Sequence, residues 1–233
     1  MSSPISAVSI QDVFAPDRTT CPLHGPPRHG TVPRVHIVTD TRRGRDPLDA
    51  VRGALSAGAR AIQVRDKHAT DRALLGLTRR VLTLATPFGA RVLVDDRIDV
   101  AAAAGAHGAH LGADDLPVCD ARRILGAVRV LGATARTPDA ARVATAAGAT
   151  YLGVGPAYTT RTKDGLPDPR GPAGIAAVAA ATVLPVIAIG GVTPAHVPDL
   201  LAAGAHGIAV VTAISDGADA AAAVAFLRAL QQA

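Results

Sequence analysis

The sequence predicts an α/β fold of the (β/α)8, or TIM-barrel, class, in which eight parallel strands are enclosed by a ring of helices. Three observations support this prediction: short apolar segments alternate with helix-sized segments, eight apolar segments occur, and they span about 200 residues. Each apolar segment is continuous, as expected for strands with both faces covered. An open doubly wound sheet is the competing architecture. The Gly-x-Gly-x-x-Gly turn that would favour it does not follow the first apolar segment, VHIVTD.

Turn and cap signals separate the expected strands, in the order that a repeated strand–helix unit requires. The eight apolar segments are 35–38, 61–64, 92–94, 108–111, 128–133, 151–154, 186–189 and 208–211. Expected helix starts, each a capping side chain followed by proline, are Asp46-Pro47, Thr137-Pro138 and Thr193-Pro194. Glycines that permit a left-handed turn at a helix end are Gly58, Gly105, Gly148 and Gly204.

Length and composition predict one folded domain. Of the 233 residues, 48% are hydrophobic, which is enough for one sizeable core. We expect this domain to occupy residues 34–233 and the proline-rich residues 1–33 to form a disordered extension. Two cysteines are too few for a disulfide-stapled secreted fold, so a reducing cytoplasm is the expected location. No apolar run reaches membrane-spanning length, and the sequence does not fix whether the chain forms a homo-oligomer.

Charge and aromatic content argue against a nucleic-acid partner. Aromatic residues make up 2% of the chain and tryptophan is absent, so stacking platforms for single strands are not expected. The net charge of +5 comes from arginines scattered along the chain without a basic run. A solvated surface explains this distribution better than a polyanion partner does, and a positive field also suits small phosphorylated ligands.

Polar residues gather where the expected strands end, which is the functional face of such a barrel. Gln63, Arg65 and Lys67 alternate after the second strand, so all three side chains can point into the barrel mouth. The chain has two lysines, and both lie on this rim: Lys67 in IQVRDK and Lys163 in the long loop after the sixth strand. An ordinary surface charge is the alternative for each. Two idle charges would not be expected on the same rim.

The rim residues could bind two phosphate groups. Asp96 and Asp115, from adjacent strand ends, could hold one Mg2+, although Asp96 could instead belong to a helix start with local ion pairing. Beside such a metal, basic side chains and hydroxyl groups would grip a diphosphate. These side chains are Arg65, Lys67, Thr160, Thr162 and Lys163. The Gly190-Gly191 turn and the segment IAVVTAI follow the last two strands, where backbone N–H groups often bind a monophosphate. A diphosphate site beside a monophosphate site predicts a transferase that expels diphosphate.

Six motifs, in this order and spacing, resemble the thiamine phosphate synthase family. They are IQVRDK, VDDRIDVA, GAHLGADDLP, GVGPAYTTRTK, VIAIGGVTP and HGIAVVTAI, and the resemblance runs from about residue 35 to about residue 230. It implies a (β/α)8 barrel that joins hydroxymethylpyrimidine diphosphate to thiazole phosphate, with Mg2+ as cofactor. Loss of pyrophosphate would leave a pyrimidinylmethyl cation, which the thiazole nitrogen captures.

The resemblance also implies roles for individual residues. Asp96 and Asp115 would hold Mg2+, and the expected catalytic residues are Arg65, Lys67, Thr134 and Lys163. Gln63 would contact the pyrimidine side, Asp95 would bind substrate, and His110 would line the site. Thr160, Thr162 and Lys163 would close over the diphosphate region. Gly191, Val211 and Thr212 would bind the thiazole phosphate.

Three departures from the family pattern leave other functions open. The family usually has Asn at the position of Asp95, Gln at that of Ala113, and a Ser-x-His phrase where Thr134 and Arg136 stand. A carboxylate at Asp95 would repel a diphosphate unless a metal or a neighbouring arginine offsets its charge. The alternatives are a relative of thiazole tautomerase, which usually lacks the metal aspartates and the TK loop present here, and a non-catalytic paralogue that binds thiamine intermediates.

Overall fold

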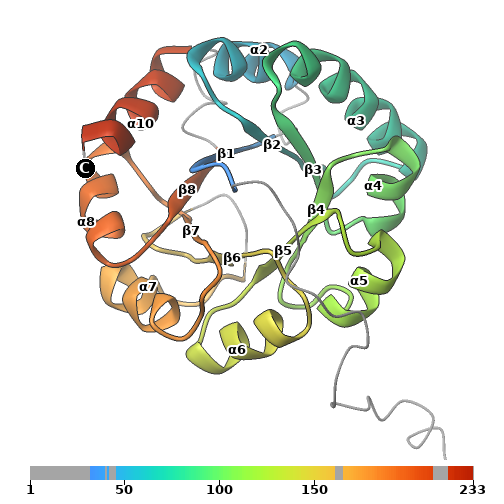
Figure 1. Ribbon diagram of the computed structural model, residues 1–233. Coiled ribbons are helices and arrows are strands. Elements are labelled where there is room, and N and C mark those ends of the chain that lie inside the picture. The colour runs from blue at the N-terminus through green and yellow to red at the C-terminus, as the bar shows by residue number, and fades with distance from the viewer. Residues whose placement is uncertain (1–31, 40, 42–45, 161–164, 212–219, 233) are drawn as a thin grey trace, which may run out of the picture.

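Eight parallel strands form a closed barrel in the order β1 to β8 (Figure 1). The computed structural model describes residues 32–39, 41, 46–160, 165–211 and 220–232. The strands are β1 (Val35–Val38), β2 (Ala61–Val64), β3 (Arg91–Asp95), β4 (Gly108–Leu111), β5 (Val130–Thr134), β6 (Tyr151–Val154), β7 (Val186–Ile189) and β8 (Gly207–Val210). Parallel pairing of β1 with β8 closes the barrel, with Ile37 beside Val210.

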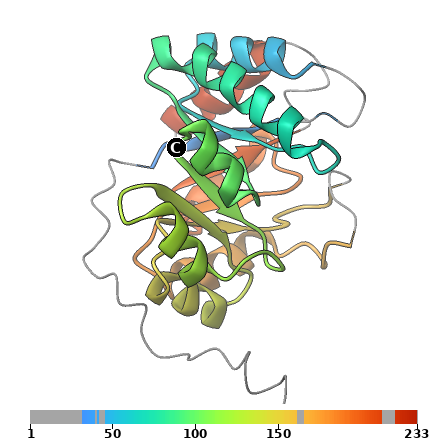
Figure 2. The ribbon, with the colours of Figure 1, turned by 90° about the vertical axis from the view of Figure 1, so that its right-hand side faces the viewer.

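Helices surround the barrel, as Figure 2 shows from the side. They are α2 (Leu48–Ala57), α3 (Asp71–Ala85), α4 (Ile98–Ala104), α5 (Val118–Leu125), α6 (Pro138–Ala146), α7 (Gly171–Ala179), α8 (Val197–Ala202) and α10 (Ala220–Gln232). Two short 3-10 helices, η1 (Thr86–Phe88) and η2 (Pro194–His196), precede β3 and α8. The predicted barrel is therefore confirmed, and the open doubly wound sheet is excluded.

Cap signals in the sequence place most helix ends correctly. Thr137 caps α6 by accepting a hydrogen bond from the Ala140 N–H. The four glycines expected at helix ends all have positive φ angles. Asp46 accepts from the Leu48 N–H, but α2 begins one residue later than expected, so Pro47 precedes the first helical turn. The fifth strand also begins late, at Val130, because the preceding Val128 is 80% exposed and lies outside the barrel wall.

Apolar side chains form two layers. The larger cluster fills the space between strands and helices, with Ile62, Val92 and Leu152 fully buried. A smaller cluster lies inside the barrel and consists of Val32, Val38, Leu93, Val130, Tyr151, Ile187 and Ala209. In the part of the chain that the structure describes, no helix is both long and apolar enough to cross a membrane.

Candidate active site

One cavity opens at the carboxyl ends of the strands and collects most of the predicted site residues. Parallel strands end on the same side of a barrel, so residues far apart in sequence meet there. The predicted residues that line the cavity are Gln63, Arg65, Lys67, Asp95, Asp96, His110, Thr134, Thr160, Gly191 and Val211. Thr162, Lys163 and Thr212 lie outside the described residues.

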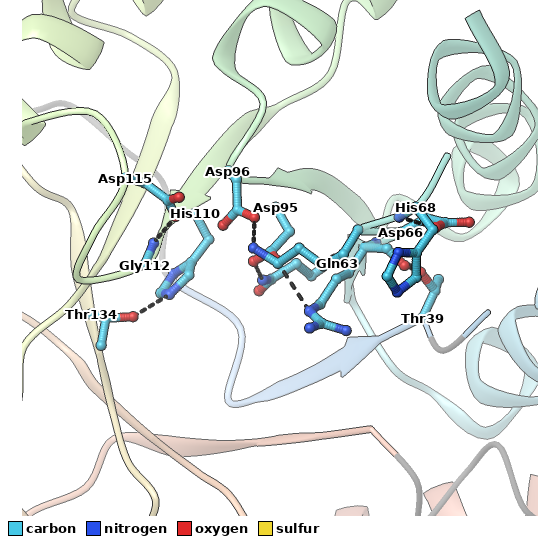
Figure 3. Close-up of polar contacts among 12 residues, drawn as sticks. Thr39, Gln63, Asp66, His68, Asp95, Asp96, His110, Gly112, Asp115 and Thr134 are labelled. Atoms are coloured by element: carbon cyan, nitrogen blue, oxygen red, sulfur yellow. Dashed lines mark hydrogen bonds and ion pairs between the residues drawn. The ribbon is translucent and has the colours of Figure 1, made fainter. Parts of the chain in front are cut away.

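Asp95 is the centre of a polar network at the ends of β2 and β3. Its carboxylate accepts a hydrogen bond from the Gln63 Nε2 group (Figure 3) and lies 3.3 Å from Arg65 Nε. Lys67 Nζ is 3.8 Å from the same carboxylate. The Asp95 side chain is 10% exposed, so these contacts are only weakly screened by water. The neighbouring arginine thus offsets the negative charge that distinguishes this position from the usual Asn.

Asp96 adopts a backbone conformation that is uncommon for residues other than glycine. Its φ angle is +59°, in the left-handed region, and its carboxylate forms an ion pair with Lys67. Asp96 does not cap the next helix: Arg97 occupies the N-cap position of α4, without a side-chain cap hydrogen bond, and forms ion pairs with Asp99 and Asp71. The turn at Asp96 instead directs its carboxylate toward the cavity.

Asp115 lies beside Asp96 across Gly112. The Asp115 Oδ2 atom accepts a 2.6 Å hydrogen bond from the Gly112 N–H. A Cβ atom on Gly112 would lie 2.8 Å from Asp115 Oδ2 and 3.9 Å from Asp96 Oδ1. Both carboxylates therefore border the space beside Gly112 that a larger residue would fill. Asp115, Asp96 and Asp95 follow one another along this edge of the barrel in Figure 3.

This pair of carboxylates fits Mg2+ and does not fit a softer metal. Mg2+ binds to one or two carboxylates and completes its shell with water and substrate phosphates. Within the described residues, no group of three or more His, Cys, Asp or Glu side chains is arranged to hold a metal by itself. Asp96 and Asp115 are therefore the candidate ligands, with the Lys67 ammonium as the present counter-ion of Asp96.

A chain of polar side chains on β4, β5 and β6 continues the cavity wall next to the aspartates, because His110 on β4 is paired with Asp95 on β3. His110 Nδ1 is 2.9 Å from the Tyr151 hydroxyl oxygen, and His110 Nε2 is 3.1 Å from Thr134 Oγ1. Burial, with a smaller contribution from Asp95, raises the pKa of Tyr151. The His36 ring packs edge-on against Tyr151 with centroids 5.0 Å apart, and burial lowers its pKa to about 3. Both rings are thus neutral and form part of the cavity floor.

The ends of β7 and β8 present backbone instead of charged side chains. Gly190 and Gly191 have φ angles of +95° and +64°, and a Cβ on Gly191 would lie 2.4 Å from the Thr159 carbonyl oxygen. No other residue fits this turn without rearrangement. Within the described residues, the N–H groups of Gly191 and Val192 donate no hydrogen bond, so both remain able to bind a ligand.

Three cavity residues with polar side chains were not identified as site residues from the sequence. His36 and Tyr151 stand inside the apolar strand segments VHIV and YLGV. Their polar atoms were the one signal that could have distinguished them from core residues. Arg136 was noted only as a departure, yet it lines the cavity, and its buried Nε group has no hydrogen-bond partner among the residues that the structure describes. A buried, unpaired donor that borders a cavity is a candidate ligand contact.

Comparisons with known proteins agree with this geometry. The family model for thiamine monophosphate synthase matches residues 35–214. A thiamine-phosphate synthase from Salinispora arenicola is 58% identical over 202 residues, which cover 84% of this chain and 97% of the relative. The solved structure of thiamine phosphate pyrophosphorylase from Pyrococcus furiosus matches with a TM-score of 0.78 and 31% identity, covering 85% of this chain and 96% of that one. The chain therefore belongs to the thiamine monophosphate synthase family.

Proposed function

We propose that the protein is a transferase that moves the hydroxymethylpyrimidine group from its diphosphate to thiazole phosphate, giving thiamine phosphate and pyrophosphate. One observation carries this proposal: a single cavity combines an apolar floor with a charged rim. The floor includes Val38, Tyr151 and Ile187, whereas the rim carries Arg65 and Lys67. A flat heteroaromatic ring suits the floor, and a diphosphate suits the rim.

The residues of β2 and β3 would hold the pyrimidine diphosphate. The hydrogen bond from Gln63 Nε2 to Asp95 leaves the Gln63 carbonyl oxygen to accept from the substrate. Arg65 and Lys67 would contact the diphosphate, with Lys67 leaving its ion pair with Asp96. Asp96 and Asp115 would hold Mg2+, which when bound neutralises charge on the departing oxygens.

The residues of β7 and β8 would hold the thiazole phosphate. The N–H groups of Gly191 and Val192, which donate to no described residue, can bind phosphate oxygens, because backbone donors in a tight turn form an anion site. Gly190 and Gly191 border the same cavity as Arg65 and Lys67. The thiazole nitrogen could therefore reach the pyrimidinylmethyl carbon as the bond to the diphosphate breaks.

Asp95 need not abolish activity. Its two nearest cations, Arg65 and Lys67, lie within 4 Å of its carboxylate. Lys67 also pairs with Asp96, so the charges of Asp95, Asp96, Arg65 and Lys67 sum to zero. A diphosphate that arrives with its metal does not meet an uncompensated carboxylate. This balance favours an active enzyme over a silent binding protein.

A two-substrate assay distinguishes the proposed function from its alternatives. Purified protein is mixed with both substrates and Mg2+, with and without EDTA, and pyrophosphate and thiamine phosphate are measured. The proposal predicts that pyrophosphate release requires the thiazole partner and stops when EDTA is added. Isomerisation of thiazole phosphate alone would indicate the tautomerase relative, and binding without turnover would indicate the non-catalytic paralogue. A cytoplasmic location and a possible homo-oligomer stay predictions from the sequence.

A further inference from the structure

Tyr151, His110 and Thr134 form a continuous hydrogen-bonded line from the cavity floor to its wall. The three residues come from β6, β4 and β5, and the strand register brings them together. His110 is paired with Gly132 on β5, and Gly132 is paired with Tyr151 on β6. The His110 and Tyr151 rings therefore meet above Gly132, where neither strand alone would place them.

The strands are shaped to make room for this line. A Cβ on Gly132 would lie 2.2 Å from Tyr151 Cζ and 2.5 Å from His110 Nδ1. A Cβ on Gly153 would lie 2.8 Å from His110 Cε1. Any larger residue at either glycine would displace the rings, so the two glycines keep the imidazole in its present position.

The direction of the first hydrogen bond follows from burial. Tyr151 is 1% exposed, and burial keeps its hydroxyl protonated. A buried hydroxyl hydrogen needs an acceptor, because leaving it unpaired would cost about 1–3 kcal/mol. Among the described residues, His110 Nδ1 is the one acceptor within hydrogen-bond distance of the Tyr151 hydroxyl. The tyrosine therefore donates, and His110 Nδ1 accepts.

The direction of the second hydrogen bond follows from the first. A neutral imidazole that accepts at Nδ1 carries its hydrogen on Nε2. The Nε2–H group then donates to Thr134 Oγ1, 3.1 Å away. The threonine oxygen is occupied as an acceptor on that side, so its own hydrogen points elsewhere. Within the described residues nothing accepts this hydrogen, and Thr134 lines the cavity.

We propose that Tyr151 is a positioning residue that fixes the His110 tautomer and thereby makes the Thr134 hydroxyl a donor to the departing diphosphate. This inference rests on the proposed function. In the opposite tautomer, His110 Nε2 would accept from Thr134, and the threonine hydrogen would turn away from the substrate. Tyr151 thus acts on the reaction through two other side chains and without a contact to the diphosphate.

The tautomer can be measured without any turnover. Imidazole 15N shifts and long-range couplings separate the two neutral forms, and a His110→Gln variant identifies the His110 signals among those of eight histidines. We expect the Nε2–H form in the wild-type protein and a mixture in Tyr151→Phe. The Nδ1–H form in the wild-type protein, or an unchanged Nε2–H form in Tyr151→Phe, would overturn the inference.

A double-mutant cycle tests the kinetic consequence. Thr134→Val should lower kcat about 100-fold, as removal of a donor to developing charge does in other enzymes. Tyr151→Phe should lower kcat about tenfold in the wild-type and Thr134→Ser backgrounds, and less than twofold in the Thr134→Val background. Equal tenfold losses in all backgrounds would mean that Tyr151 does not act through Thr134.

Two controls separate positioning from folding and from the proposed function itself. The chain's other tyrosine, Tyr158, stacks on His196, so Tyr158→Phe should leave kcat and the His110 signals unchanged. Unfolding temperatures of all variants confirm that each is folded. A wild-type protein that is inactive but shows the Nε2–H form would overturn the proposed function and the kinetic role of Tyr151 together, while the tautomer assignment would stand.

Discussion

Arginine side chains at the two ends of the barrel differ in how fully their hydrogen-bond donors are satisfied. Near the amino-terminal end, Arg122 is 4% exposed, and its guanidinium donates four hydrogen bonds to the carbonyl oxygens of Gly126, Arg129 and Gly148. At the carboxyl-terminal end, Arg65 Nε lies 3.3 Å from the Asp95 carboxylate, and the buried Arg136 Nε group has no partner in the described part of the chain. Donors that the protein satisfies hold the fold together. Donors that it leaves open are available to a ligand.

The largest predicted effect falls on the carboxyl-terminal end. Asp115→Asn should lower kcat about 100-fold at limiting Mg2+, because one of two candidate metal ligands is lost. The free energy of unfolding should change by less than about 1 kcal/mol, since the amide oxygen can still accept from the Gly112 N–H. Steady-state kinetics across a Mg2+ series and urea unfolding measure the two quantities. Wild-type turnover at limiting Mg2+ would remove Asp115 from the metal site.

A matched pair of arginine variants tests the comparison directly. Arg122→Met should lower the free energy of unfolding by about 3 kcal/mol, because several buried carbonyl groups lose a charged donor. Its KM values should stay at wild-type levels wherever the protein is folded. Arg65→Met should do the reverse, lowering kcat/KM more than tenfold with a stability loss of about 1 kcal/mol. The neighbouring exposed Arg123, changed to Met, is the control and should cost under about 0.5 kcal/mol. A loss of activity without a loss of stability in Arg122→Met, and the opposite in Arg65→Met, would contradict the comparison.

His36 should make the stability of the protein depend on mildly acidic pH. Burial holds its pKa at about 3 in the folded state, whereas the unfolded chain has a value near 6.5. Between these values the unfolded state binds one more proton, so stability is lost as pH falls, by about 1.4 kcal/mol per pH unit. Urea unfolding of wild type and His36→Gln between about pH 4.5 and 6 should show a shallower slope for the variant. Equal slopes of unfolding free energy against pH would show that His36 does not take up the additional proton on unfolding in this range.

The smallest effect is expected at Arg136. Its Nε group is buried and donates to none of the described residues, so Arg136→Met should leave the free energy of unfolding unchanged or raise it slightly. If the guanidinium binds the substrate, KM for the pyrimidine diphosphate should rise about fivefold, which corresponds to about 1 kcal/mol. Unchanged KM values for both substrates would show that Arg136 is not a ligand contact.

Local sequence patterns predicted most of the fold and the positions of several site residues. From the two-residue period of a strand, Gln63, Arg65 and Lys67 were predicted to face one cavity, and all three line it. From the adjacency of the third and fourth strands, Asp96 was predicted to lie near Asp115, and both carboxylates lie beside Gly112. Neither signal depends on the detailed register of the barrel.

The remaining features depend on tertiary structure. The meeting of His110 with Tyr151 is set by pairing across β4, β5 and β6, which the sequence of one strand does not encode. The open Nε group of Arg136 is visible only once its surroundings are known. The left-handed turn at Asp96 was also not predictable, because aspartate adopts it only where the fold requires it.

A crystal structure with thiamine phosphate, pyrophosphate and Mg2+ would test the central claim most directly. The account predicts pyrophosphate against Arg65 and Lys67, a metal between Asp96 and Asp115, and an altered ion pair between Lys67 and Asp96. Ligands bound outside the carboxyl-terminal cavity, or a metal that touches neither aspartate, would contradict it.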